Sequence, residues 1–142
     1  MRCIRVDEPA EFDRLVAEAL TESRDVFVLF FGREQAGTGV SWCPDCVIAD
    51  PLVRRAIAKV EGSILLEVPV DPRSNTASPA HIFRERGDVQ LGCVPTLLRW
   101  TAAGPSQRRL VEDECREERI DAFVAETSAW HAPGRVRNVP RQ

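Results

Sequence analysis

The feature that most constrains the fold of this chain is the run Trp-Cys-Pro-Asp-Cys at residues 42–46. It follows a continuously apolar segment, residues 26–31, which predicts a buried strand, and it precedes an amphipathic helical pattern. Two thiols at this spacing can close an intramolecular disulfide, and Pro44 favours the start of a helix. The free N–H groups and positive dipole at that helix start favour the thiolate of Cys43. Because a thiolate attacks disulfides, the run predicts reversible chemistry between Cys43 and Cys46.

A structural zinc site is the main alternative for two cysteines at this spacing, and chemically inert cysteines are a second one. Structural zinc needs four ligands, usually from a second Cys-x-x-Cys or a closely spaced pair of histidines. The remaining potential ligands are scattered singly along the chain: Cys3, Cys93, Cys115, His81 and His131. We therefore favour redox chemistry, and we expect neither a metal nor a cofactor.

Composition narrows the class of protein and its compartment. A chain of 142 residues fits one domain with a core large enough to fold unaided. The net charge of -3 argues against nucleic acid as a partner. No apolar run approaches the roughly 18 residues of a membrane span, and the N-terminus lacks the apolar core of a secretory signal. Five cysteines, an odd number, do not suit a fully paired extracellular framework, so we expect a cytoplasmic location. We also expect the protein to be a monomer.

Hydrophobic periodicity predicts the order β-α-β-α-β-α-β-β-α, with the cysteine pair where the second strand meets the second helix. The predicted domain covers residues 1–131, and residues 132–142 form a basic tail that we expect to be disordered. Strands are predicted at residues 3–6, 26–31, 63–70, 94–100 and 108–112, with a hairpin turn at 103–106 before the last one. Helices are predicted at residues 8–23, from the cysteines to Val60, at 80–86 and at 116–130. The second helix carries an apolar stripe formed by Val47, Ile48, Leu52, Val53, Ala56, Ile57 and Val60.

Several strings resemble a known family in sequence and in order. They are Leu-Phe-Phe-Gly at residues 29–32, Ser-Trp-Cys-Pro-Asp-Cys at 41–46, Asp-Pro-Leu-Val-Arg at 50–54, Val-Pro-Thr-Leu-Leu-Arg at 94–99 and Leu-Val-Glu-Asp-Glu-Cys at 110–115. On these strings the chain resembles the thioredoxin domain-containing protein 17 family of the thioredoxin superfamily. That family is also called Clot, or the fourteen-kilodalton thioredoxin-related protein. The resemblance implies an α/β thioredoxin fold, with a central mixed β-sheet flanked by helices on both faces.

The resemblance also implies a cytosolic disulfide reductase that acts on small or exposed disulfides such as cystine. Its electron donor would be thioredoxin reductase or a comparable dithiol donor. Cys43 would be the attacking thiol and Cys46 the resolving one. Trp42 would border the active surface, and Pro95 would be a cis-proline beside the pair. A redox-sensitive binding protein, whose cysteine pair switches a partner without turnover, is the alternative function.

Other positions depart from the family pattern or carry separate expectations. Residues 71–92 match poorly, which predicts a different substrate-facing loop. Cys93 is expected to be a small buried residue, as are Cys3 and Cys115, and a third redox thiol is the alternative for Cys93. No acid precedes the motif in residues 28–30, so Asp45 could assist proton transfer through water while its charge disfavours acidic partners. The long loop at residues 32–41 is expected to narrow access to Cys43.

Overall fold

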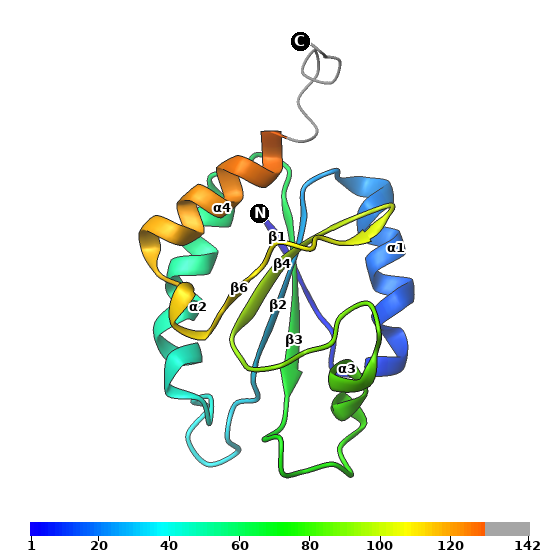
Figure 1. The fold of residues 1–142 in the computed structure, drawn as a ribbon, viewed down its shortest axis with the longest axis vertical. Helices are drawn as coiled ribbons and strands as arrows, with labels where there is room; N and C mark the ends of the chain where they lie inside the picture. Colours follow the sequence, from blue (N-terminus) through cyan, green and yellow to red (C-terminus); the bar gives the residue numbers. More distant parts are fainter. Residues whose placement is uncertain (130–142) are drawn as a thin grey trace.

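Six strands form one mixed sheet in the computed structural model, which describes residues 1–129 (Figure 1). They are β1 (Arg2–Arg5), β2 (Val26–Gly32), β3 (Ile64–Val70), β4 (Thr96–Thr101), β5 (Gly104–Pro105) and β6 (Leu110–Val111). The strands lie in the order β1-β3-β2-β4-β5, and β6 also pairs with β4. β3 is parallel to β1 and β2, whereas β4 is antiparallel to β2, β5 and β6. The sheet is therefore mixed, as the sequence predicts.

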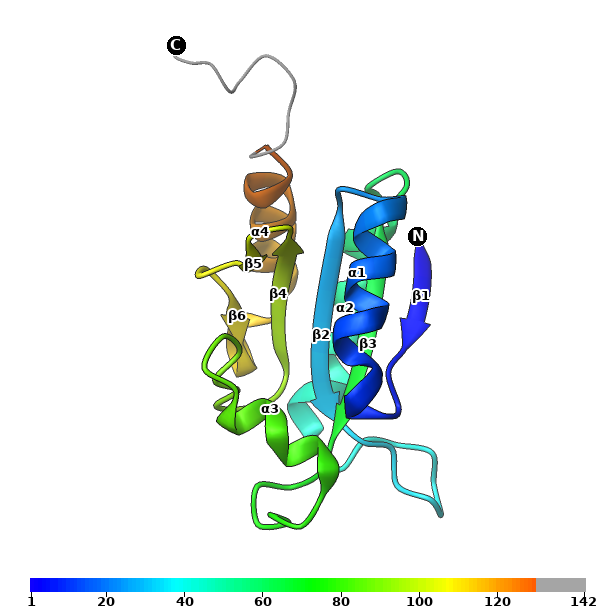
Figure 2. The same ribbon diagram turned by 90° about the vertical axis from the view of Figure 1, so that its right-hand side faces the viewer.

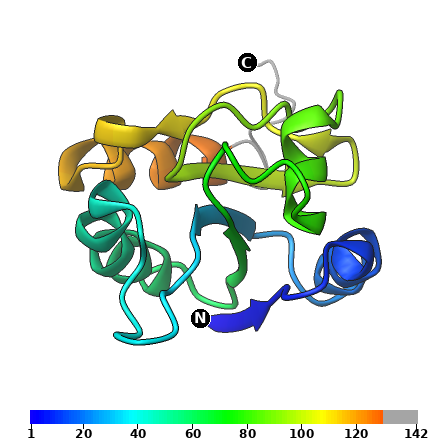
Figure 3. The ribbon, with the colours of Figure 1, turned by 90° about the horizontal axis from the view of Figure 1, so that it is seen from below.

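Helices cover both faces of the sheet, again as predicted (Figures 1 and 3). On one face lie α1 (Phe12–Glu22) and α3 (Ile82–Glu85); on the other, α2 (Pro44–Ala58) and α4 (Glu117–Ala129) contact each other. The short 3-10 helices η1 (Pro9–Glu11), η2 (Pro79–His81) and η3 (Glu112–Glu114) precede α1, α3 and α4. Because β2 is covered on both faces, all of its residues are buried, which explains its continuously apolar sequence.

An aromatic cluster joins the first helix to the segment that follows β3. The ring of Phe12 on α1 lies edge-on to Phe83 of α3 and Trp100 of β4, with centroids 5.1 and 5.2 Å apart. Phe30 of β2 also packs against Phe83, at 5.2 Å. Tilted and edge-on ring pairs of this kind are favourable beyond the area they bury. The cluster thus fixes α3 against the central strands and anchors the surrounding residues 71–92.

The predicted last hairpin is wrong in detail, because Ser106 interrupts it. The Ser106 N–H donates to the Arg99 carbonyl at 2.8 Å, and its hydroxyl accepts from the Arg99 N–H and donates to the Arg108 carbonyl. These bonds replace regular strand pairing, so the returning strand is split into the two-residue strands β5 and β6. The other predicted elements are present with shifted ends. The predicted tail, residues 132–142, and the domain end at 131 lie outside the described residues.

The predicted apolar stripe of α2 is also wrong at its first turn. Val47 and Ile48 are 46% and 63% exposed, whereas Cys46 and Ala49 are buried there. The first turn lies where β2 and β3 end, so only one narrow side of it faces the core. Parallel strands present their carboxyl ends at one edge of a sheet, and β2 and β3 end there at Gly32 and Val70. This lower end of Figure 1 holds both cysteines of the motif.

Candidate active site

Cys43 caps the start of α2, as the sequence predicts. Its backbone is extended, with φ -104° and ψ 111°, and Pro44 occupies the first turn of the helix. The Cys43 sulfur accepts the Cys46 N–H at 3.3 Å, so it receives one of the N–H groups that a helix start leaves free. The Cys43 N–H donates to the Ser41 hydroxyl at 3.1 Å, which fixes the approach to the helix.

Cys46 lies one turn into the helix and faces the interior. Its sulfur accepts the Gly32 N–H at 3.3 Å. Burial raises the pKa of the Cys46 thiol well above its usual range, the adjacent Cys43 sulfur adds to this, and the Gly32 N–H partly offsets it. The two side chains differ little in exposure, since Cys43 is 6% and Cys46 3% exposed. All five cysteines of the chain are free thiols.

Gly32 allows β2 to pass directly beneath the cysteine motif. A Cβ at this position would lie 2.8 Å from the Cys43 Cβ, 2.8 Å from the Ser41 hydroxyl oxygen and 2.9 Å from the Trp42 ring. Real Cβ atoms do not approach other atoms so closely, so glycine is required here by contact rather than by backbone angle. The Ser41 hydroxyl also donates to the Gly32 carbonyl at 2.6 Å, which ties the strand end to the motif.

Trp42 and the loop that carries Val94 and Pro95 adjoin the cysteine pair. The Trp42 indole N–H donates to the Val70 carbonyl at 2.9 Å, so the half-buried ring is fixed to the end of β3. The predicted cis Val94-Pro95 bond is present. The Cys43 thiol donates to the Val94 carbonyl at 3.5 Å, which places the proline loop against the pair as predicted. The Pro95 carbonyl accepts the Glu112 N–H at 2.7 Å, which links this loop to η3.

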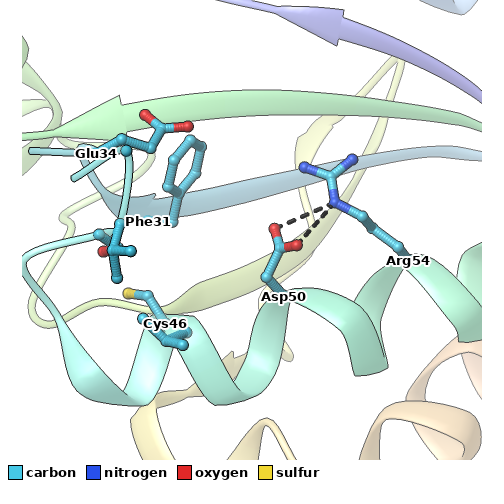
Figure 4. A pocket seen from close by; sticks show the side chains of 9 residues that line it. Phe31, Glu34, Cys46, Asp50 and Arg54 are labelled. Atoms are coloured by element: carbon cyan, nitrogen blue, oxygen red, sulfur yellow. Dashed lines mark hydrogen bonds and ion pairs between the residues drawn. The ribbon is translucent and has the colours of Figure 1, made fainter. Parts of the chain in front are cut away.

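Two hollows flank the cysteine pair, one beside each sulfur. A groove of about 270 Å³ exposes the Cys43 side, and its lining residues are Trp42, Cys43, Pro44, Asp45, Arg73, Arg84, Gly92, Cys93, Val94 and Glu112. A second hollow of about 300 Å³ lies on the Cys46 side (Figure 4). It is lined by Phe31, Glu34, Gly39, Val40, Ser41, Cys46, Val47, Asp50 and Arg54. The two sulfurs therefore face different surroundings. We call these the Cys43 groove and the Cys46 hollow.

Two acids, Glu34 and Asp50, line the Cys46 hollow, whereas Asp45 lines the Cys43 groove. Figure 4 shows Cys46, Asp50 and Arg54 projecting from one side of α2. The Arg54 guanidinium donates to both Asp50 carboxylate oxygens, at 3.1 and 3.0 Å. Sequence reasoning missed Asp50, although its four-residue spacing from Cys46 places both side chains on one helix face.

The sequence predicts that the long loop at residues 32–41 narrows access to Cys43, and this prediction is wrong. The loop lines the Cys46 hollow instead of narrowing the Cys43 groove. The Glu34 carboxylate accepts two hydrogen bonds from Arg5 of β1, at 2.9 and 2.8 Å, and this pair draws the loop toward the β1 edge. Figures 2 and 3 show the loop and residues 71–92 on different sides of this end of the sheet. The Cys43 groove is bordered by residues 71–92 instead.

Of the remaining cysteines, which the sequence predicts to be buried, only Cys115 is buried. Burial raises the pKa of the Cys115 thiol to about 12. Cys3 is exposed because β1 is an edge strand. Cys93 is exposed because it follows the exposed Gly92 on the open side of the Cys43 groove. Within residues 1–129 no group of three or more His, Cys, Asp or Glu side chains could hold a metal ion. Over the same residues no helix is long and apolar enough to cross a membrane.

Comparison with known proteins identifies relatives over most of the chain. Thioredoxin domain-containing protein 17 of Epinephelus coioides is 37% identical over 106 residues, which are 74% of this chain and 79% of that protein. Thioredoxin-like protein Clot of Oryza sativa subsp. japonica is 33% identical over 125 residues, 83% and 89% of the two chains. The human thioredoxin domain-containing protein 17 is 33% identical over 111 residues, 78% and 83% of the two chains.

Solved structures with the same fold include thioredoxins of low sequence identity. Reduced thioredoxin pre-protein of Schistosoma mansoni superposes with a TM-score of 0.63 at 14% identity, covering 89% of this chain and 98% of that one. A chain from a complex of ferredoxin:thioredoxin reductase and thioredoxin f2 has a TM-score of 0.61 at 13% identity, covering 92% and 96%. These likenesses show the thioredoxin fold. A family model for the thioredoxin domain of thioredoxin domain-containing protein 17-like proteins matches residues 5–126, and the chain belongs to this family.

Proposed function

We propose that this protein is a cytoplasmic dithiol–disulfide oxidoreductase that reduces small or exposed disulfides. The observation that carries the proposal is the position of Cys43. Its sulfur accepts a helix-start N–H from Cys46 and contacts the Val94 carbonyl beside a cis-proline, on an open groove. A cysteine attacks a disulfide as its thiolate, so the reacting sulfur must be one that a substrate can reach. Membership of a thioredoxin-like family supports the same reaction class.

In the first step the Cys43 thiolate attacks one sulfur of a substrate disulfide. A bond forms between the Cys43 sulfur and that sulfur, the substrate disulfide breaks, and the second substrate sulfur leaves as a thiolate that takes a proton from water. Within the described part of the chain the Val94 N–H donates to no acceptor, so an extended substrate can pair with it. Trp42 and Pro95 border the reacting sulfur and Pro44 begins the helix beneath it.

In the second step Cys46 resolves the mixed disulfide. Its thiol must first lose a proton, and burial opposes this by raising its pKa. The hollow beside Cys46 is open enough to hold water, and Asp50 lines it. We assign to Asp50 the role of accepting this proton through water. The Cys46 thiolate then attacks the Cys43 sulfur, the Cys43–Cys46 disulfide forms, and the remaining substrate thiolate leaves; two electrons have passed to the substrate.

A dithiol donor must reduce the Cys43–Cys46 disulfide before the next cycle. Thioredoxin reductase, or a comparable dithiol donor, is the partner we propose. One chain with the same fold comes from a complex of ferredoxin:thioredoxin reductase and thioredoxin f2, which supports a partner of this kind. A cytoplasmic location suits five free thiols, because reducing conditions keep such thiols reduced.

The substrates we propose are cystine, mixed disulfides and selected protein disulfides on protruding loops. The reason is the shape of the site. Cys43 is 6% exposed at the floor of a groove, so a flat protein surface cannot bring a disulfide to its sulfur. A slower reduction of insulin than of cystine, relative to an ordinary thioredoxin with the same donor, is the expected result.

Repeated turnover separates this function from that of a redox-sensitive binding protein. The protein is given cystine in large excess together with thioredoxin reductase and NADPH. The thiols released are measured with a colour-forming thiol reagent. We expect many thiols per protein, none with the Cys43→Ser variant, and unchanged turnover with Cys3→Ser, which removes an exposed thiol outside the site. If the protein released only one equivalent of thiols although the electron donor was continuously regenerated, the result would instead support a redox-sensitive binding protein.

A further inference from the structure

One wall of the Cys43 groove carries two arginines from the segment that matches the family poorly. Arg73 and Arg84 both line the groove together with the Cys43 sulfur. Each donates a guanidinium N–H to the same acceptor, the Gly92 carbonyl; the Arg84 bond is 2.9 Å long. Arg84 also donates to the Asp71 carbonyl at 3.2 Å. Two positive charges are thus held close together beside the reacting thiol.

Neither guanidinium forms an ion pair with a carboxylate among residues 1–129; their bonds go to neutral backbone carbonyls. Asp71 supplies only its carbonyl, because its carboxylate accepts from Arg33 at 3.0 Å and from the Ser78 hydroxyl. Burial, and then the charge of Arg73, lowers the pKa of Arg84. Two cations with no bound counter-charge in a cleft attract an anion, and a guanidinium matches a carboxylate in shape.

The acids of the groove belong to a different wall. Asp45 and Glu112 line the Cys43 groove, but both also line an adjoining hollow that contains Arg116. Arg73 and Arg84 line the groove but not this adjoining hollow. The groove is therefore polarised, with its basic side at Gly92 and its acidic side at the start of α2 and at η3. The expected exclusion of acidic partners by Asp45 would then hold only for groups that approach the acidic side.

We propose that Arg73 and Arg84 form an anion subsite, which directs disulfides bearing a carboxylate near the sulfur to Cys43. The inference rests on the proposed function and names the substrate class of that site. The carboxylate accepts guanidinium hydrogen bonds while the Cys43 thiolate attacks the neighbouring sulfur. The arginines bind and orient the substrate; electrons and protons move only as described above.

Three disulfides with the same two-carbon arms test the subsite: dithiodipropionate is anionic, bis(hydroxyethyl) disulfide is neutral and cystamine is cationic. Protein reduced beforehand and freed of reductant is mixed with each one, and the rate of a single turnover is measured by acid quench and mass spectrometry. Each rate constant is divided by that of dithiothreitol with the same disulfide, which removes differences between the leaving thiols. This design needs no reductase.

The normalised rate constant for the anionic disulfide should exceed that for the neutral one by about tenfold. This is the lower end of the increase that a charged cleft gives to association rates. The preference should shrink as salt rises from about 0.01 M to about 1 M, because screening shortens from roughly 30 to 3 Å. The Arg73→Gln and Arg84→Gln variants should each lose part of the preference, measured as the ratio of the normalised rate constants for the anionic and the neutral disulfide. Arg109→Gln is the matched control, because Arg109 also donates to a carbonyl, that of Val89, but lies outside the groove.

Failure of the subsite and failure of the proposed function give different results. If the wild-type protein reduces all three disulfides at equal normalised rates, or its preference does not change with salt, the anion subsite is wrong and the oxidoreductase proposal stands. If it reduces none of them, the proposed function itself is wrong. The wild-type salt dependence needs no variant, so it decides the matter even where an arginine variant fails to fold.

Discussion

The two sides of the cysteine pair differ in how their charges are paired. In the Cys46 hollow Glu34 is held by Arg5, and Arg54 pairs with Asp50 and with Glu67. In the Cys43 groove the two arginines of the basic wall bond to carbonyls alone within the described residues. In the Cys46 hollow the charged side chains neutralise one another, so they stabilise a fixed structure. In the Cys43 groove the two arginines have no carboxylate partner among the described residues, so they are suited to bind an anionic ligand. The difference supports the proposed division, with substrate binding on the Cys43 side of the pair and proton transfer on the Cys46 side.

The largest effect is expected at Gly32, which separates the two sides. Gly32→Ala places a Cβ 2.8 Å from the Cys43 Cβ, so the motif must shift. Overpacking of this kind costs about 1–3 kcal/mol of folding free energy, and it should also slow single-turnover reduction. Urea unfolding of the wild-type protein and of the Gly32→Ala variant measures the loss of folding free energy. Gly37→Ala is the matched control, because a Cβ there meets nothing within 4 Å. Equal stability of the Gly32 and Gly37 variants would refute the close packing described for the motif.

A smaller effect is expected at Asp50, on the proton-transfer side. Asp50→Asn removes the carboxylate but keeps the size of the side chain, so the resolving step should slow by about tenfold, below the usual range for general base catalysis because water remains. Formation of the first mixed disulfide should not change. Rapid quench with mass spectrometry follows both species, and Asp45→Asn is the control on the other side. A slower first step in Asp50→Asn, with normal resolution, would contradict the division between the sides.

The smallest effect is expected at Glu34, which only positions the loop. Hydrogen bonds from Arg5 lower the pKa of Glu34 to about 2, against about 4.3 in an unfolded chain. A lowered pKa contributes stability that is present above pH 4.3 and is lost as pH falls toward 2. Because the Glu34 side chain is 37% exposed, screening keeps this below about 1 kcal/mol. In the Glu34→Gln variant the free energy of unfolding should therefore fall slightly less between about pH 4.3 and pH 2 than in the wild-type protein, as measured by urea unfolding at a series of pH values. A large loss of activity at neutral pH would show that the loop acts on the Cys43 groove after all.

Sequence reasoning succeeded where the relevant contacts are local. The cap at Cys43, the helix start at Pro44 and the buried strand β2 all follow from residues near one another in the chain. The position of the loop did not follow, because Arg5 and Glu34 are 29 residues apart. The same holds for the basic wall, since Arg73 reaches Gly92 across 19 residues. Exposure of Val47 and Cys93 depends on where the sheet ends, which periodicity does not report.

The most direct test of the account is to locate the mixed disulfide on a Cys46→Ser variant. That variant cannot complete the second step, so a substrate disulfide should remain attached to the attacking thiol. Cys93 makes the test demanding, because it is exposed in the same groove whereas Cys43 is 6% exposed. After exposure to dithiodipropionate, digestion and mass spectrometry without reductant should place the adduct on Cys43. An adduct mainly on Cys93, with Cys43 left free, would contradict the central claim that the capped thiol is the nucleophile.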